Sequence, residues 1–182
     1  MNDNKNNHLK YLNNLKDFKV AKDNPDVRGW SLTDADDNNI GKIENFLVDI
    51  DAEAVRYLEV SLFPEHKDAV DTKNAAKETE EPHTIRSGKE GVRLIVPIGL
   101  ARINKDKHTV KTDRISTENY KNLPVLFEGE MPSQEFERDV VDKFNGNQDN
   151  LNRGTDDSQT YTVFYHQDCF DQECFFEKDQ RS

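Results

Sequence analysis

The sequence predicts a mainly β domain with short helices and a C-terminal extension that is part helical and part aromatic. Residues 46–50 and 57–62 alternate between apolar and polar side chains, with the period of two that a β-strand imposes. Residues 92–98 form a third, nearly continuous apolar run. The last twenty-two residues hold six of the sixteen aromatic side chains (ten Phe, five Tyr, one Trp), which favours a docked segment over an exposed tail.

The elements before the first two alternating strands are short. One residue in three is apolar near the N-terminus, at Leu9, Leu12, Leu15 and Phe18. This spacing predicts a short helical turn. A cluster of Asp and Asn at 34–39 predicts a turn, because these side chains cap their own backbone. The polar stretch 51–54 predicts a hairpin turn, and each flanking strand should have one largely apolar and one polar face.

The later elements alternate between polar segments and strands. Residues 64–91 are polar and lack any period, which predicts a long insertion. Strands are predicted at 92–98 and 108–112. Ser116 can cap a short helix, which must end by Pro124.

Residues 133–145 carry the clearest helical pattern. One face is apolar, at Phe136, Val140, Val141 and Phe144. Acidic residues lie in the first turn, Lys143 lies in the last, and Gly146 follows directly, as expected at a helix C-terminus.

We expect the hydrophobic core to be formed by apolar residues of the strands and the loops between them. Trp30 could anchor a partner instead, but a core position is the interpretation we favour. The expected core is Val20, Trp30, Leu32, Ile43, Phe46, Val48, Ile50, Leu58, Val60, Leu62, Leu94, Val96, Ile98, Val110 and Leu126.

Composition restricts the compartment and the partners. The net charge is −11, and a surface this acidic repels phosphate, which argues against nucleic acid and anionic membranes as partners. No run approaches the ~20 apolar residues of a membrane span, and residues 1–7 lack the apolar region of a secretory signal. The two cysteines do not form a disulfide framework. We therefore expect a cytoplasmic protein without membrane insertion.

Four segments in order resemble the PRC-barrel family. They are PDVRGW (25–30), IGKIENFLVDID (40–51), VRYLEVSL (55–62) and LIVPIGLARI (94–103). Within that family they are similar to the cytoplasmic domain of the photosynthetic reaction-centre H subunit. The resemblance implies a small SH3-like β-barrel used for assembly and interaction rather than catalysis. The sequence departs from the H subunit in lacking an N-terminal membrane anchor and in carrying the 64–91 insertion, so we expect a soluble stand-alone homologue.

These observations divide the chain into three parts. Residues 1–17 are an N-terminal extension, and residues 18–127 are the barrel with its 64–91 insertion. Residues 128–182 are a C-terminal extension. It comprises the helix at 133–145, a polar linker at 147–159 and an aromatic docking segment at 160–176.

Two groups of carboxylates invite a chemical interpretation. Asp34, Asp36, Asp37 and Asn38 begin like a calcium loop, but the positions that require glycine and a bidentate glutamate hold Asn39 and Asn45. A solvated Asx turn fits better. The second group could act as paired acids or a proton relay, with Asp49 and Asp51 crowded on one strand face. Its members are Asp49, Asp51, Glu53 and Glu59.

His166, Cys169 and Cys174 form a weak metal-ligand pattern. A structural zinc site needs a fourth ligand from elsewhere in the chain, such as His8, His66, His83 or His108. Thiols among aromatic residues are the simpler interpretation. We identify no catalytic or cofactor-binding residues, and we expect no cofactor and no small-molecule ligand.

The sequence supports a non-catalytic module that binds a protein partner or forms a homodimer. The C-terminal segment docks either on its own barrel or on a second copy. The alternative is a small-ligand or metal-binding protein that uses the acidic turn or the His/Cys segment. A third possibility, an adaptor in ribosome assembly, rests on analogy with another PRC-barrel family and on the fit of an acidic surface to a basic protein.

Overall fold

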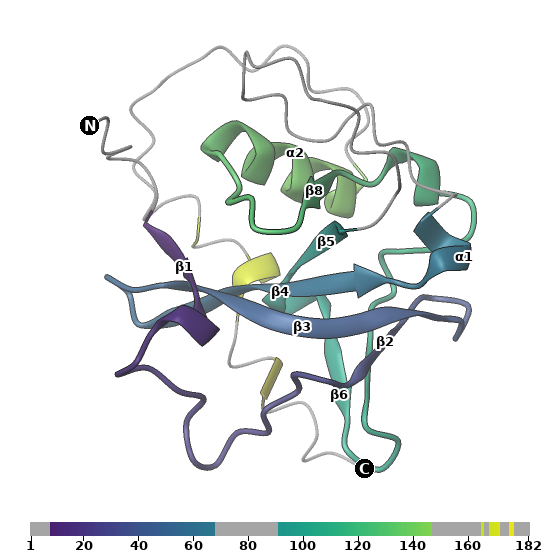
Figure 1. Ribbon diagram of the computed structural model, residues 1–182. Helices are drawn as coiled ribbons and strands as arrows, with labels where there is room; N and C mark the ends of the chain where they lie inside the picture. The colour runs from purple at the N-terminus through teal and green to yellow at the C-terminus, as the bar shows by residue number, and fades with distance from the viewer. Residues whose placement is uncertain (1–7, 68–90, 147–164, 166–167, 172–174, 177–182) are drawn as a thin grey trace.

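The computed structural model describes residues 8–67, 91–146, 165, 168–171 and 175–176 (Figure 1). Within them, eight strands form one sheet: β1 (Leu9–Tyr11), β2 (Ser31–Thr33), β3 (Asn39–Asp49), β4 (Ala54–Leu62), β5 (Val92–Pro97), β6 (Arg102–Asn104), β7 (Thr109–Lys111) and β8 (Val125–Phe127). The helical elements are α1 (Pro64–Lys67), α2 (Gln134–Asn145) and the 3-10 turns η1 (Leu12–Asn14), η3 (Ile98–Leu100), η4 (Tyr120–Asn122) and η5 (Asp168–Phe170). The prediction of a mainly β protein with short helices is confirmed.

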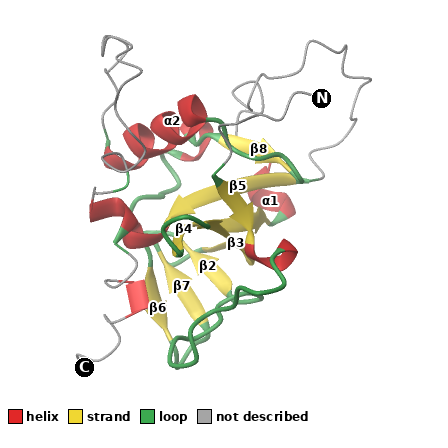
Figure 2. Cartoon of the chain, turned by 90° about the vertical axis from the view of Figure 1, so that its left-hand side faces the viewer, coloured by secondary structure: helices red, strands yellow, loops and turns green. Residues whose placement is uncertain are grey.

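The sheet follows the order β6-β7-β2-β3-β4-β5-β8, and β1 joins β3 beside this path. β2 and β7 run parallel, whereas the other pairs are antiparallel. Figure 2 shows how the sheet curls, with β6 at the lower end and β8 at the upper end, to the right of α2 in this view. Among the described residues the two end strands do not pair with each other, so hydrogen bonds do not close the curl into a complete barrel.

The hairpin of β3 and β4 is the centre of the sheet. The register shifts between Ile43 and Asn45 and again between Leu47 and Val48. Each shift is a β-bulge, which bends the strand and increases its twist. Residues 50–53 form the connecting turn, as the sequence predicted.

Both faces of this hairpin are buried, which corrects the expectation of one apolar and one polar face. Leu47 is as buried as its neighbour Phe46, and Tyr57 is as buried as Leu58. The second face is covered because η1 contacts β3 while η3 and η5 contact β4. The elements that cover it come from the N-terminal part, the middle and the C-terminal part of the chain.

The expected core is correct apart from three positions. Val20 and Trp30 are half-buried and pack against the core from the long connection before β2. The Trp30 ring also contacts the His108 ring, with centroids 4.8 Å apart. Ile50 is half-buried in the hairpin turn. All three lie outside strands, where alternation gives no information about which side chains are buried.

Helix α2 confirms the helix predicted for 133–145. The Ser133 hydroxyl accepts a hydrogen bond from the backbone N–H of Phe136 at 3.2 Å, which caps the N-terminus. Gly146 ends the helix with φ 76°, a left-handed conformation that glycine adopts without strain. The buried face includes the expected apolar residues and also Glu137.

Two short elements differ from their predictions. The predicted N-terminal helical turn is present as η1, but it is shorter than predicted, because residues 9–11 form strand β1 and pair with β3. Ser116 does not cap a helix; its backbone N–H donates to the Asn119 side chain. Between Ser116 and Pro124, all of which the structure describes, the helical residues are those of η4.

Several predicted segments lie largely outside the described residues. Of the 64–91 insertion the structure describes α1 and Gly91, and of the 147–159 linker it describes nothing. Within the 160–176 segment it describes Tyr165, 168–171 and 175–176.

Val60→Asp tests the central packing. Val60 is fully buried on β4 and pairs with Ile43 and Leu94. The new carboxylate would lie unpaired in the core, so the free energy of unfolding should fall by more than about 3 kcal/mol in a urea titration.

Lys42→Asp is the control, because Lys42 lies exposed on the adjacent strand β3. Its substitution should change the unfolding free energy by less than about 1 kcal/mol. Equal stability of Val60→Asp and the wild type would contradict the burial of this position.

Candidate functional site

The acidic turn at 34–38 binds its own chain. Asp34 is fully buried, and its carboxylate accepts hydrogen bonds from the backbone N–H groups of Asp36 and Asn38 at 2.9 and 2.8 Å. It also accepts from the Asn38 side chain at 3.0 Å and from the Tyr120 hydroxyl at 2.7 Å. Burial alone would raise the pKa of Asp34, but these hydrogen bonds together lower it below its ordinary value. The predicted Asx turn is confirmed, but it is not solvated at Asp34, whose carboxylate is buried.

The neighbouring acids of this turn also make contacts within the chain. Asp36 accepts a hydrogen bond from the Thr117 hydroxyl at 3.3 Å, and Asp37 accepts one from the Lys111 ammonium at 2.7 Å. In the part of the chain that the structure describes, no three His, Cys, Asp or Glu side chains are grouped to hold a metal ion.

The structure separates the second set of predicted acids. Asp49 is buried at the end of β3 and lies 3.1 Å from the Arg56 guanidinium, whereas Asp51 and Glu53 are exposed in the turn. Glu59 is buried further along β4. The expectation that Asp49 and Asp51 crowd each other on one strand face is wrong, because the strand ends between them.

Of the His/Cys pattern only Cys169 lies within the described residues; His166 and Cys174 lie outside them. Cys169 is a buried thiol in η5, and burial raises its pKa to about 12.

A buried cluster centres on Glu137 of α2. Its carboxylate oxygen Oε2 accepts hydrogen bonds from the Tyr57 hydroxyl at 2.8 Å and from the Tyr165 hydroxyl. The Arg56 guanidinium lies 4.2 Å from the centre of the Tyr165 ring and pairs with Asp49. We call these five residues the Glu137 cluster.

The Glu137 cluster joins four parts of the chain: β3, β4, α2 and the C-terminal segment. His8 adds the N-terminal segment, because its Nε2 lies 2.7 Å from the Tyr165 hydroxyl. Sequence reasoning missed this site. Its one sequence signal was an acidic residue, Glu137, directly beside Phe136 on the apolar face of a helix.

Burial controls the protonation of the cluster. It raises the pKa of Glu137 from its ordinary 4.5 to about 7, against the opposing effect of the two tyrosine hydroxyls. Burial also raises the pKa of Tyr57 and of Tyr165, and the nearby Glu137 carboxylate adds to both shifts. Glu137 is therefore the member that titrates near neutral pH.

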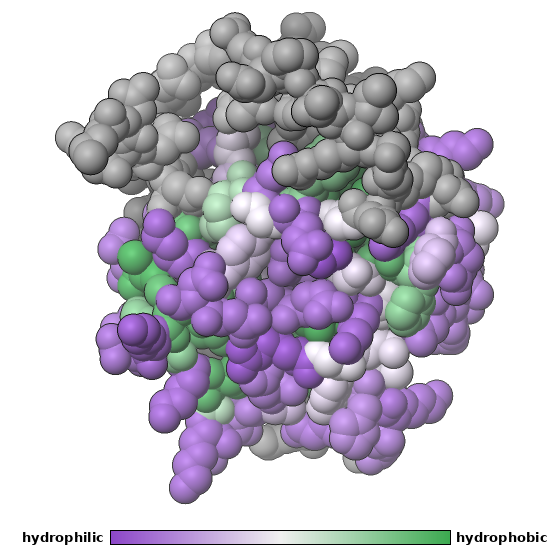
Figure 3. All heavy atoms as spheres, viewed as in Figure 1, coloured by the Kyte–Doolittle hydropathy of each residue, from purple (hydrophilic) through white to green (hydrophobic). Residues whose placement is uncertain are grey.

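A second site is a polar hollow of about 290 Å³ that opens to solvent, which we call the polar groove. It is lined by Tyr11, Asn13, Asn14, Glu44, Asn45, Glu59, Arg93, Glu128 and Gly129. The groove therefore lies between the N-terminal segment, the central strands and the turn before α2. Figure 3 shows that the face viewed in Figure 1 is mostly hydrophilic, with only small separate hydrophobic areas.

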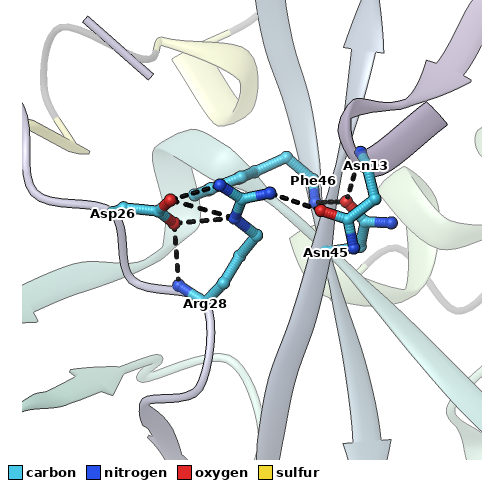
Figure 4. Close-up of polar contacts among 5 residues, drawn as sticks. All are labelled: Asn13, Asp26, Arg28, Asn45 and Phe46. Carbon is cyan, nitrogen blue, oxygen red and sulfur yellow. Dashed lines mark hydrogen bonds and ion pairs between the residues drawn. The ribbon is translucent and has the colours of Figure 1, made fainter. Parts of the chain in front are cut away.

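One wall of the groove is held by the bulge of β3. Figure 4 shows the Asn45 side chain accepting hydrogen bonds from the backbone N–H groups of Asn13 at 3.2 Å and of Phe46 at 2.9 Å. Arg28 donates to the Asn13 side chain and is itself held by Asp26. These contacts fix the loop after β1 against the sheet.

The charges of the groove are mostly negative. Arg93 lies 3.0 Å from Glu128 and 3.9 Å from Glu59, and it donates to the Ser61 hydroxyl at 3.1 Å. Burial raises the pKa of Glu59 although Arg93 opposes the shift, and it also raises the pKa of Tyr11. Glu44 adds a further carboxylate to the lining.

A protein-family model, the PRC-barrel domain, matches residues 19–118, more than half of the chain. The chain belongs to the PRC-barrel family. This confirms the resemblance seen in the sequence. No curated protein matches the chain. No helix in the described ranges is long and apolar enough to cross a membrane.

The PRC-barrel match covers β2 to β7 but excludes β1, β8, α2 and the C-terminal segment. Both sites combine residues from inside and outside the match. In the Glu137 cluster, Arg56 and Tyr57 lie inside it and Glu137 lies outside. In the groove, Arg93 lies inside it and Tyr11 outside.

Glu137→Gln tests the buried carboxylate. The folded pKa of about 7 exceeds the ordinary 4.5, so the folded state binds this proton more tightly than the unfolded state does. The resulting stabilisation is complete below pH 4.5 and is lost as the pH rises through 7. Glutamine does not titrate. Between pH 5 and 8, the free energy of unfolding of the wild type should therefore fall by up to about 3 kcal/mol relative to that of the variant.

The measurement is urea unfolding of both proteins at half-unit pH steps. Glu135→Gln on the same helix is the control, because Glu135 is exposed and the substitution removes a carboxylate outside the cluster. If the wild type and Glu137→Gln kept a constant stability difference from pH 5 to 8, the proposed protonation of Glu137 would be wrong.

Proposed function

We propose that this PRC-barrel protein is a non-catalytic module for protein interaction or assembly in the cytoplasm. The family supports the general role, because its barrels are mostly non-catalytic and occur in assemblies. One observation carries the proposal for this chain. The buried polar side chains of the described residues form hydrogen bonds or ion pairs with other residues of the same chain.

Each buried polar side chain in the described ranges has a partner of this kind. Asp34 binds Tyr120, and Asp49 pairs with Arg56. The others are Asn45 with Asn13, Glu59 with Arg93, Thr112 with Arg114, and Glu137 with Tyr57 and Tyr165. Catalytic acids and bases need a face open to a substrate. Most of these groups instead hold segments together that are distant in the chain, which favours a structural role. Thr112 binds only two residues away, and Glu59 also lines the open polar groove.

The polar groove is the surface we assign to the partner. Glu44 and Glu128 lie at accessible positions and Glu59 lies deeper. Among the described residues of the lining, Arg93 is the one cation. The groove thus adds a negative site to a chain whose net charge is −11. A basic segment of a protein is the partner that this charge favours, and the same charge disfavours nucleic acid.

The metal-binding alternative has less support. The carboxylates of Asp34, Asp36 and Asp37 already accept hydrogen bonds from their own chain. A metal ion would have to replace those contacts, and Asp34 would also have to leave the core.

The prediction is that the double variant Glu44→Lys/Glu128→Lys loses a partner that the wild type binds. The immobilised full chain should retain one basic protein from extracts of its native cell, and binding should weaken as salt rises from 50 to 500 mM. The matched control is Asp51→Lys/Asp106→Lys, which makes the same change in net charge at two exposed turn positions.

Retention by the control and loss from the groove variant, with unchanged unfolding free energies, would support the groove. Equal retention by both variants would exclude it as the contact surface. Light scattering of the full chain tests the homodimer. A turnover that a single carboxylate substitution abolishes would contradict the non-catalytic proposal.

A further inference from the structure

The C-terminal segment docks on the sheet through two aromatic residues. The Tyr165 ring lies against the Arg56 guanidinium, and its hydroxyl bonds to Glu137. The Phe170 ring meets the Tyr57 ring edge-on at 5.2 Å and the Tyr165 ring at 4.8 Å. Both residues are almost fully buried. The segment thus covers the residues that form the centre of the Glu137 cluster.

A glycine sets the backbone position of this docked segment. A Cβ atom on Gly99 in η3 would lie 2.3 Å from the carbonyl oxygen of Asp168 and 2.8 Å from the backbone nitrogen of Asp171. Both atoms are backbone and cannot move without moving η5. Any side chain at position 99 would therefore push the segment away from the sheet.

We propose that docking of Tyr165 and η5 on the sheet is coupled to protonation of Glu137, so that docking is stronger in mild acid and weaker at higher pH. This goes beyond the proposed function, because it concerns the fold's own C-terminal segment rather than a partner. Docking places Tyr165 and Phe170 over a carboxylate and keeps water from it. A charged carboxylate without water is costly, so protonation favours the docked state.

The balance of opposing effects sets the direction. Two hydroxyls stabilise the ionised carboxylate, but the cost of burial is larger, and the pKa of Glu137 rises to about 7. When the segment leaves, the Tyr165 hydroxyl is replaced by water while Tyr57 remains on β4. The pKa of Glu137 then returns toward its ordinary 4.5. The docked state holds the proton more tightly, so docking weakens as pH rises through 7.

The other ionisable groups around Glu137 do not account for this dependence. His8 contacts the Tyr165 hydroxyl, which donates to Glu137, so His8 must act as the donor through Nε2. Its imidazole can donate there both as the neutral Nε2–H tautomer and as the cation. Asp49 and Arg56 pair with each other, and burial raises the pKa of Tyr57.

Cys169 provides the measurement, because it is buried in the docked η5. In a Cys174→Ser background, its rate of reaction with a maleimide is measured in the folded protein and in urea at each pH. We call the rate in urea divided by the rate in the folded protein the protection of Cys169. The ordinary pH dependence of thiolate reactivity affects both rates equally and cancels in this ratio. Protection should fall about tenfold between pH 6 and 8 in this protein and stay constant in Glu137→Gln.

Two controls identify the source of the change. Gly99→Ala, which displaces η5, should leave Cys169 poorly protected at every pH. His8→Gln should keep the dependence on pH. Amide exchange of Leu58 and Val60 should not follow the protection of Cys169, because the opening is local rather than global.

Protection of Cys169 that stays constant with pH in the wild type would overturn the proposal. The same pH dependence in Glu137→Gln as in the wild type would also overturn it, and so would a loss of the pH dependence in His8→Gln. If Glu137→Gln does not fold, titration of the Glu137 carboxyl carbon by NMR replaces it. The pKa should be at least one unit lower in Gly99→Ala than in the wild type. Equal values would show that docking and protonation are independent.

Discussion

A single buried carboxylate holds together the parts of the chain that the sheet alone does not join. Glu137 accepts the hydroxyls of Tyr57 from β4 and Tyr165 from the C-terminal segment. Leaving an ionised carboxylate in the interior without partners costs several kcal/mol, so the two hydroxyls favour the packed positions of α2 and the C-terminal segment. The Arg56–Asp49 pair extends the constraint to β3 and to the face of the Tyr165 ring.

This constraint explains why the central hairpin is buried on both faces. The region matched by the PRC-barrel domain supplies the strands from β2 to β7, and that curled sheet has two open ends. The segments before and after the match then cover what the sheet leaves exposed. These covering segments contain polar residues, because a segment that buries carboxylates and amides must form hydrogen bonds with them.

The same covering segments determine where the molecule can interact. At the Glu137 cluster they pack tightly, with Gly99 allowing close backbone contact. At the groove they approach less closely, so that Glu59 and Arg93 face an open hollow between Tyr11 and Glu128. This open polar hollow is the surface to which we assign the proposed partner.

The sequence by itself determined the features whose causes are local. Alternation located the β3–β4 hairpin, Ser133 and Gly146 located the ends of α2, and the Asp and Asn cluster identified the Asx turn. Only the tertiary structure decided that Glu137 meets Tyr57, eighty residues away along the chain, and that Trp30 is only half-buried. Local patterns record the period of a helix or strand, whereas the meeting of distant polar side chains depends on how the elements pack.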